Sequence, residues 1–222
     1  MTEAPPASPG APARSTVHES EQAHNVHEAN NLGMWLFLAG EVLFFGSMFL
    51  GYLIYRYTYP EAFADASRHL DIVIGSINTT LLLTSSFTMA LAVNAIQLDK
   101  RRALIAFLVI TMLLGAVFVG LKGLEYIHKI QENLFPGGAF TYPGQYAQPA
   151  RLFLSLYFTM TGLHAVHMIA GILVLGIMVW RAARNHFSSA NYDAIEMTGL
   201  YWHFVDIVWI FLFPLLYLID RS

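Results

Sequence analysis

The chain has 222 residues, of which 56% are hydrophobic and only 12% are charged, whereas soluble domains average about 45–50% and about 25%. This composition, with a positive mean hydropathy, excludes an ordinary soluble domain and indicates an integral membrane protein. The net charge of −3 gives no reason to expect a nucleic acid partner, and the absence of cysteine excludes disulfides, thiolate metal sites and cysteine nucleophiles.

Residues 1–30 are rich in Pro, Ala, Ser, Glu and His and show no apolar periodicity. They predict a polar, mostly disordered N-terminal tail, although a short surface helix over 16–30 is compatible with the residues. His18, His24 and His27 are expected to be solvated rather than metal-bound, because nothing in the tail fixes their geometry. A cleaved signal peptide is not expected, since the first apolar run starts only near Leu32.

Five apolar runs follow the tail, at approximately 31–55, 71–98, 103–127, 150–180 and 196–219. Each exceeds the roughly 20 residues that a helix needs to cross a bilayer, and a β-barrel would show short alternating segments instead. The sequence therefore predicts an all-α integral membrane protein in which residues 31–222 form a bundle of five transmembrane helices. The basic cluster at 100–102 predicts that the N-terminus lies inside and the C-terminus outside.

Small residues recur within the runs, among them Gly115 and Gly171. Small residues let helix backbones approach closely in lipid, where apolarity alone drives no association. We therefore expect these glycines at contacts between helices.

Glu41 lies inside the first run, roughly 15 Å deep if each helical residue rises about 1.5 Å. A carboxyl group at this depth is expected to stay protonated unless water or a cation reaches it. Two interpretations stay open, a proton relay and a neutral acid that forms a hydrogen bond inside the bundle. An intramembrane acid favours a functional role.

Two histidines of the fourth run, His164 and His167, share one helix face because they are three residues apart. His203 and Asp206 share a face of the fifth run in the same way, with Glu196 two turns earlier. Two histidines stacked on one helix cannot hold a haem from both sides, and a metal would need His203, Asp206 or Glu196 as further ligands. We expect instead a structural polar cluster whose members bond to each other, to lipid headgroups or to water.

Near the end of the third run, Lys122 and Glu125 are also three residues apart, so they are expected to pair, or Lys122 to reach the headgroups. Aromatic residues near the helix ends, including Tyr52, Tyr157 and Tyr217, are expected to anchor the helices at the membrane interface. The chain has no glycine-rich phosphate loop, nucleophile elbow or HExxH pattern. The residues alone therefore predict a helical membrane subunit without a self-sufficient catalytic site.

Several motifs occur in a fixed order: 33–46 (GMWLFLAGEVLFFG), 77–86 (INTTLLLTSS), Glu125-Tyr126, 161–167 (TGLHAVH), Glu196 and 201–206 (YWHFVD). With these motifs the chain after residue 30 resembles subunit III of the haem-copper terminal oxidases, the cytochrome c oxidase family. With five predicted helices, the chain resembles the shorter bacterial form of this subunit, which lacks the two leading helices of the longer members. Lys122 departs from the family pattern, which has a neutral polar residue at this position.

The resemblance implies a non-catalytic subunit of a proton-pumping oxidase that reduces oxygen with electrons from cytochrome c. It implies that haem and copper are held by partner subunits, that subunit I is the main contact, and that subunit II, small subunits and a respiratory supercomplex are further partners. It also implies bound phospholipid, stabilisation of subunit I during turnover, support of proton uptake, and a multi-pass location in the bacterial cytoplasmic (inner) membrane.

The residues carried over from the family fall into two sets, and the resemblance assigns neither a catalytic nor a metal-binding role to either. They are Glu41, His164 and His167 as proton-related or buried polar residues, and Glu196, His203 and Asp206 as lipid-binding or structural residues.

The sequence leaves three alternatives to a cytochrome c oxidase subunit III. A quinol oxidase subunit III would have the same fold, and the electron donor is chosen on other subunits. A nitric oxide reductase-associated membrane protein is disfavoured by Glu41 together with the complete 201–206 motif. A stand-alone transporter, which belongs to a different class, is disfavoured because the chain shows neither internal repeats nor helices broken around a central site.

Overall fold

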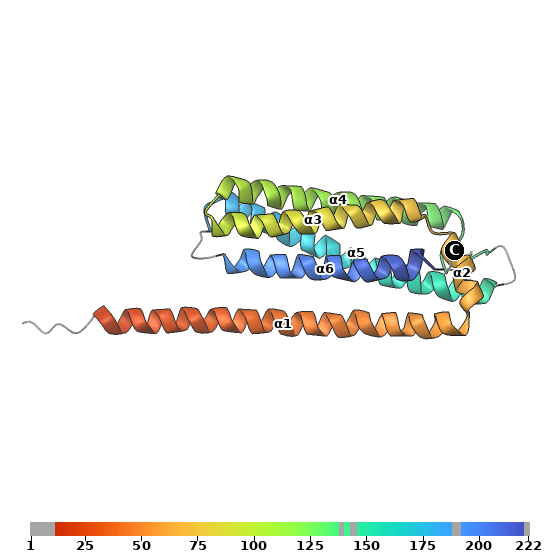
Figure 1. Ribbon diagram of the computed structural model, residues 1–222, viewed down its shortest axis with the longest axis horizontal. Coiled ribbons are helices and arrows are strands. Elements are labelled where there is room, and N and C mark those ends of the chain that lie inside the picture. The colour runs from red at the N-terminus through yellow and green to blue at the C-terminus, as the bar shows by residue number, and fades with distance from the viewer. Residues whose placement is uncertain (1–11, 138–139, 143–145, 188–191, 220–222) are drawn as a thin grey trace, which may run out of the picture. The chain divides into compact units, whose positions relative to one another are not determined.

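The computed structural model describes residues 12–137, 140–142, 146–187 and 192–219, with side chains from residue 28 onward. The described residues form six helices, shown in Figure 1: α1 (Pro12–Thr58), α2 (Pro60–Arg68), α3 (Ile72–Gln97), α4 (Arg101–Gln131), α5 (Ala147–Ala183) and α6 (Asp193–Tyr217). Five of them are long and apolar enough to cross a membrane, with the first candidate span at Glu28–Thr58. The predicted all-α fold and its five transmembrane helices are confirmed, whereas the sidedness stays a prediction.

The first helix differs from the sequence-based expectation at its start. α1 begins at Pro12, so the segment predicted as a polar tail is helical from that residue and continues into the first span. Residues 12–30 contain three Ala and three Glu, which have high helix propensity. The prediction for residues 1–11 and the side chains of His18, His24 and His27 lie outside the described part of the chain.

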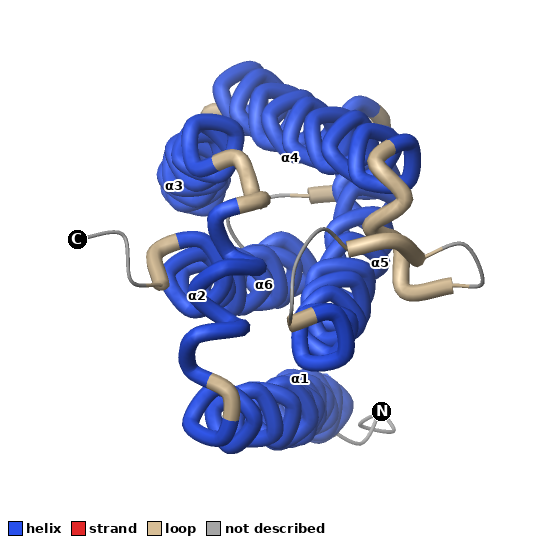
Figure 2. Tube along the Cα trace, turned by 90° about the vertical axis from the view of Figure 1, so that its right-hand side faces the viewer, coloured by secondary structure: helices blue, strands red, loops and turns tan. Residues whose placement is uncertain are grey.

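Residues up to Gly40 and residues 41–222 form two compact units. All the buried polar side chains of the spans belong to the second unit. Within this unit α3, α4, α5 and α6 form a four-helix bundle, in which α3 contacts α4 and α6, and α5 also contacts α4 and α6. α3 and α5 therefore lie on opposite sides of the bundle, as the view along the helices in Figure 2 shows.

The part of α1 from residue 41 onward packs against α5 and α6 through aromatic side chains. The centre of the Phe45 ring lies 5.4 Å from the centre of the His167 ring of α5 and 6.4 Å from the centre of the Phe204 ring of α6. Nearer the end of α1, the Tyr52 hydroxyl donates a hydrogen bond to the carbonyl of Leu215. Tyr52 is 0% exposed, so its predicted role as an interfacial anchor is wrong.

The short helix α2 was not predicted from the sequence, because nine residues are too few to give a membrane-spanning signal. Pro60 stands at the start of this helix, where its fixed φ suits the first turn, and Glu61 and Arg68 complement the helix dipole at the two ends. Phe63 of α2 is fully buried and contacts Phe153 of α5 at 5.3 Å. The helix therefore closes one end of the bundle.

The ends of the spanning helices follow local rules. The Asp71 carboxylate caps α3 by accepting hydrogen bonds from the backbone N–H groups of Val73 and Ile74 at 2.8 and 3.2 Å. Asn133 and Asn185, which follow α4 and α5, have φ values of 58° and 60°. Asparagine tolerates this left-handed conformation better than most residues, so both positions favour termination of the helix.

Trp202 of α6 is, with Trp209, among the largest fully buried side chains of the described residues and is 0% exposed. Its indole N–H donates to Ser85 Oγ of α3 at 2.7 Å. A Cβ atom added at Gly115 of α4 or Gly171 of α5 would lie 2.7 or 2.9 Å from the indole ring. The two glycines therefore lie at contacts between helices, as expected, but they make room for a tryptophan rather than for a second backbone.

Candidate functional site

An acid and an imidazole meet inside the membrane-spanning part of the fold. Glu41 Oε2 of α1 lies 3.2 Å from His167 Nε2 of α5, and the two side chains are only 20% and 18% exposed. Glu41 Oε2 has no hydrogen-bond partner among the described residues. The contact is therefore one of ion-pair distance, without the geometry of a hydrogen bond.

The contact made by the other ring nitrogen of His167 shows which nitrogen carries a hydrogen. Nδ1 lies 2.8 Å from the carbonyl oxygen of Leu163, and a carbonyl can only accept, so Nδ1 carries a hydrogen. In a neutral imidazole Nε2 is then an acceptor, and a contact with Glu41 requires a protonated carboxyl group. If the imidazole is charged, Nε2 donates to a carboxylate. A hydrogen bond between Nε2 and Glu41 therefore needs one proton that the two groups share.

Residues of α6 enclose this pair. The Tyr201 hydroxyl donates to the backbone carbonyl of His167 at 2.9 Å. Phe45 covers the imidazole edge-on. The pair is therefore formed between α1 and α5, with Tyr201 of α6 beside it, whereas the sequence analysis expected the histidines to bond within a polar cluster of the last two spans.

His164 lies one turn before His167 but has a different environment. It is 1% exposed, lies between the rings of Phe118 at 5.6 Å and Trp209 at 5.3 Å, and neither ring nitrogen has a hydrogen-bond partner among the described residues. His164 and His167 are thus not joined in one polar cluster.

The structure does not pair His203 with Asp206. His203 Nδ1 instead lies 2.6 Å from Ser86 Oγ of α3. The Ser86 hydroxyl lies beside the Asp206 carboxyl group, yet neither carboxyl oxygen has a hydrogen-bond partner in the described part of the chain. Asp206 and Asn78 are 2% and 0% exposed, and the Asn78 amide is also unpartnered among those residues.

Glu196 lies apart from these groups. It is half-buried in the first turn of α6, where its negative charge is favoured by the helix dipole. The six residues singled out by the sequence thus fall into separate environments rather than one continuous seam.

A charged cluster occupies the interior between α4, α5 and α6. The sequence predicted only the pairing of Lys122 with Glu125 in it. Lys122, 3% exposed, donates from Nζ to Glu125 Oε2 at 3.0 Å and to the hydroxyls of Tyr157 at 3.0 Å and Tyr217 at 2.8 Å. Both tyrosine hydroxyls also donate to Glu125 Oε1, at 2.8 and 2.7 Å. The three donors of the ammonium group are therefore all used, and the alternative in which Lys122 reaches the headgroups is wrong.

Aromatic rings surround the same ammonium group. Lys122 Nζ lies 4.9–5.5 Å from the ring centres of Tyr126, Tyr157, Trp209 and Tyr217, a geometry that stabilises a cation. Tyr157 and Tyr217 are 0% exposed, so their predicted role as interfacial anchors is wrong. This cage gives the physical reason why a lysine is tolerated at this depth.

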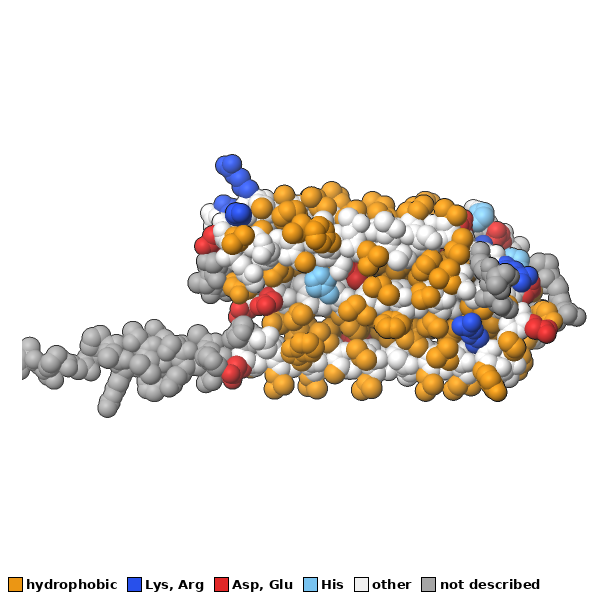
Figure 3. Space-filling model, in the orientation of Figure 1, with side chains coloured by type: hydrophobic (Ala, Val, Ile, Leu, Met, Phe, Trp, Pro, Cys, Tyr) orange, Lys and Arg blue, Asp and Glu red, His pale blue; other side chains and the backbone are white. Residues whose placement is uncertain are grey.

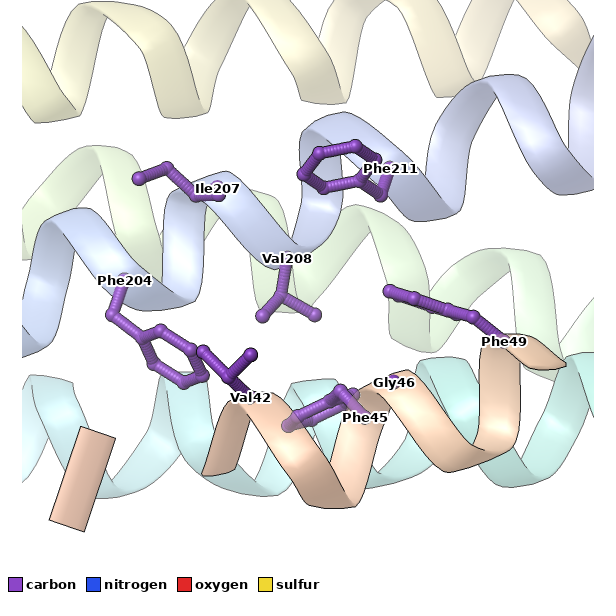
Figure 4. A pocket seen from close by; sticks show the side chains of 8 residues that line it. All are labelled: Val42, Phe45, Gly46, Phe49, Phe204, Ile207, Val208 and Phe211. Carbon is purple, nitrogen blue, oxygen red and sulfur yellow. The ribbon is translucent and has the colours of Figure 1, made fainter. Parts of the chain in front are cut away.

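An apolar groove of about 310 Å³ runs between α1 and α6. Figure 4 shows that the lining side chains come from both helices, with Phe204 and Val208 of α6 directed toward α1. It is lined by Val42, Phe45, Gly46, Phe49, Phe204, Ile207, Val208 and Phe211. The lining offers no polar side chain, so the groove suits a hydrocarbon and not a polar substrate.

Within the described residues no three His, Asp or Glu side chains come together as a metal site. The arrangement can hold and exchange a proton at Glu41 and His167, and it can accept hydrocarbon in the groove.

Residues 13–220 match the sequence profile of the family described as cytochrome c oxidase subunit III. The chain belongs to this family. It is 31% identical to a cytochrome c oxidase subunit 3 of Thermostichus vulcanus over 94% of this chain and 96% of that protein. It is 31% identical to a cytochrome c oxidase subunit 3 of Synechocystis over 92% and 82% of the two chains. A probable quinol oxidase subunit 3 of Staphylococcus saprophyticus is 30% identical over 90% and 93%.

The family membership confirms the resemblance drawn from the motifs. The chain is a multi-pass membrane subunit III of a haem-copper terminal oxidase. It acts within a complex with other oxidase subunits, and its described residues form no evident redox centre.

Proposed function

We propose that this chain is the non-catalytic subunit III of a proton-pumping cytochrome c oxidase in a bacterial cytoplasmic membrane. In this proposal haem and copper reside in partner subunits, subunit I is the main contact, and subunit II and small subunits complete the complex. The chain stabilises subunit I during turnover, binds phospholipid and supports proton uptake.

The observation that carries the proton-related part is the contact between Glu41 and His167. Two ionisable groups within the candidate spans lie 3.2 Å apart, close enough to share a proton. Intramembrane acids and histidines in such pairs are typical of proton relays. Glu41 and His167 therefore act as a local proton store, not as groups that touch oxygen.

The lipid-related part is supported by the groove between α1 and α6. Its volume of about 310 Å³ and its eight apolar lining residues suit a phospholipid acyl chain that lies along the helices. Because Phe45 lines the groove and covers the His167 ring, a bound acyl chain also keeps bulk water away from the Glu41–His167 contact.

Glu41→Gln and His167→Phe in the intact complex test this function. Both variants should keep the haem content of the wild type, because neither residue touches a redox centre, and should lower proton uptake and shorten the lifetime of the enzyme during turnover several-fold. Glu132→Gln is the control, since Glu132 lies beyond the end of α4 with a 38% exposed side chain. Loss of haem in Glu41→Gln would contradict the non-catalytic role, and unchanged proton uptake in both variants would contradict the proton store.

A quinol oxidase subunit III is the second candidate. The relatives that are about 30% identical include probable quinol oxidase subunits, and this chain does not carry the donor site in either case. Purified complex should oxidise reduced cytochrome c with saturation kinetics and a quinol only slowly. The reverse preference would assign the subunit to a quinol oxidase.

A further inference from the structure

His203 presents a hydrogen-bonding atom to the outside of the bundle at membrane depth. Its Nδ1 is occupied by Ser86, and the described residues supply no hydrogen-bond partner for its Nε2. The side chain is half-buried, and Nε2 is not among the buried unpartnered atoms of the fold. Figure 3 shows histidine surface over α6, between hydrophobic side chains and midway along the spans.

An imidazole nitrogen that faces only hydrocarbon loses its hydrogen bond to water without compensation, at a free-energy cost of about 2 kcal/mol or more. Membrane proteins avoid this cost because their intramembrane polar groups face protein or water. The Ser86 hydroxyl can either donate to Nδ1 or accept from it, so Nε2 is a donor in one tautomer and an acceptor in the other. A hydroxyl or carboxamide side chain satisfies both.

The neighbouring outward face of α3 combines small hydroxyl residues with large apolar side chains such as Val73 and Ile77. It exposes the hydroxyl residues Ser76, Thr80 and Thr84, each of which donates to the carbonyl four residues earlier. These residues are spaced four apart and so share one face. Leu83 and Phe87, 51% and 64% exposed, add apolar contact area on the same side of α3.

The opposite side of the bundle provides the contrast. The exposed large side chains in the middle of α5 are Val166, Ile169, Leu173 and Ile177, at 47–65% exposure. All are aliphatic, as expected for a surface that faces lipid. Small hydroxyl residues, by comparison, are enriched where transmembrane helices pack against each other.

We propose that the outward face of α3 together with His203 binds a transmembrane helix of another oxidase subunit, which supplies a hydroxyl or carboxamide group to His203 Nε2. We call this surface the α3/α6 face. The hydroxyl row permits close helix approach, Leu83 and Phe87 pack against the incoming helix, and His203 fixes its register. The identity of the partner as an oxidase subunit rests on the proposed function, but the position of the interface does not.

A photo-reactive amino acid placed at Leu83 tests the interface in native membranes. Leu173 is the matched control, because it is 65% exposed on the opposite helix α5 and lies well inside that span. Illumination should join the Leu83 probe to a different multi-helix chain, while the Leu173 probe yields lipid adducts only. Adducts of the Leu83 probe with lipid alone, or with a second copy of this chain, would overturn the proposal.

Haem that co-purifies with the chain separates this result from the proposed function. If haem is present and the Leu83 probe captures only lipid, the α3/α6 face fails and the oxidase assignment stands. If the Leu83 probe captures a multi-helix chain in a preparation without haem, the interface stands and the oxidase assignment fails.

Substitutions at His203 test the hydrogen bond itself. His203→Phe keeps a planar ring without polar atoms, and His203→Gln keeps a side chain that both donates and accepts. The fraction of the chain that remains with the haem-containing complex in detergent should fall several-fold for Phe and be largely restored for Gln. His186→Phe, at an exposed position after α5, should change nothing. Equal retention of His203→Phe and wild type would overturn the role of His203, and if His203→Phe fails to accumulate, the Leu83 probe decides.

Discussion

Glu41 of α1 and His167 of α5 approach to 3.2 Å between Oε2 and Nε2 inside the membrane-spanning part of the fold. The Leu163 carbonyl holds a hydrogen on His167 Nδ1, so a hydrogen bond at Nε2 needs a proton from either Glu41 or the imidazole. We predict the form with a carboxylic acid beside a neutral imidazole, because charges are costly in a medium of low dielectric.

The protonation of this pair is visible in the infrared. The wild-type complex at neutral pH should show the C=O band of a protonated carboxyl group, shifted in heavy water, and Glu41→Gln should lose it. His167→Phe should move the band to a position typical of a carboxyl group with weaker hydrogen bonding. A spectrum that contains only carboxylate bands for Glu41 would contradict the neutral pair.

The cage around Lys122 predicts a large loss of stability when it is opened. Lys122→Met leaves Glu125 buried without its cation, and breaking a buried ion pair typically costs about 3–5 kcal/mol. The double variant Lys122→Met with Glu125→Gln removes both charges and should recover part of that loss. Thermal unfolding of the purified complex measures the effect, with Lys100→Met, at an exposed loop position, as the control. A single variant as stable as wild type would show that the cage contributes nothing.

The fit of Trp202 between two glycines predicts a position-dependent effect of added methyl groups. Gly115→Ala and Gly171→Ala would each place a Cβ within 3 Å of the indole ring, and such overpacking typically costs about 1–3 kcal/mol. Gly120→Ala is the control on α4, because a Cβ there meets nothing within 4 Å. Melting temperatures should fall for the first two variants and hold or rise slightly for the third, and a uniform response would contradict the packing.

The loop between α4 and α5 gives a prediction about pH. The Tyr142 hydroxyl donates to Asp65 Oδ2 of α2 at 2.6 Å, and burial, together with this hydrogen bond and the Asp65 charge, raises the pKa of Tyr142. The raised pKa means that docking of the loop favours the neutral phenol. The contribution of the Tyr142–Asp65 contact to stability is therefore complete below the usual tyrosine pKa of about 10, and it is lost as the pH rises above that value.

Hydrogen exchange in residues 140–142 should thus accelerate above about pH 10 beyond the intrinsic chemical rate. Tyr142→Phe should exchange faster at neutral pH and lose the additional acceleration. The same pH profile in wild type and Tyr142→Phe would rule out this contact as the cause.

The spans and the polar residues inside them were predictable because both are local properties of the sequence. A run of more than 20 apolar residues predicts a transmembrane helix without reference to the rest of the chain, and Glu41 and His167 stand out within such runs. Their partners were not predictable in the same way. Helical spacing suggested His203 with Asp206, whereas the packing of α3 on α6 gives His203 to Ser86.

The partners of Tyr157 and Tyr217 were likewise not predictable from the sequence. Their position near helix ends suggested the membrane interface, but the buried Lys122 and Glu125 require donors and acceptors, and these two tyrosines supply them. A signal existed in the sequence, because a lysine inside a span must find partners. Which tyrosines those are depends on the packing of α4, α5 and α6, which spacing along one helix does not contain.

The central claim is that this chain works as subunit III of a haem-copper terminal oxidase. Affinity purification from native membranes in mild detergent, with a reduced-minus-oxidised spectrum and mass identification of the co-purifying chains, tests it most directly. We expect haem and copper to arrive with a large multi-helix partner, and the haem type to identify the oxidase. A chain that runs alone and colourless under conditions that keep other respiratory complexes intact would contradict the account.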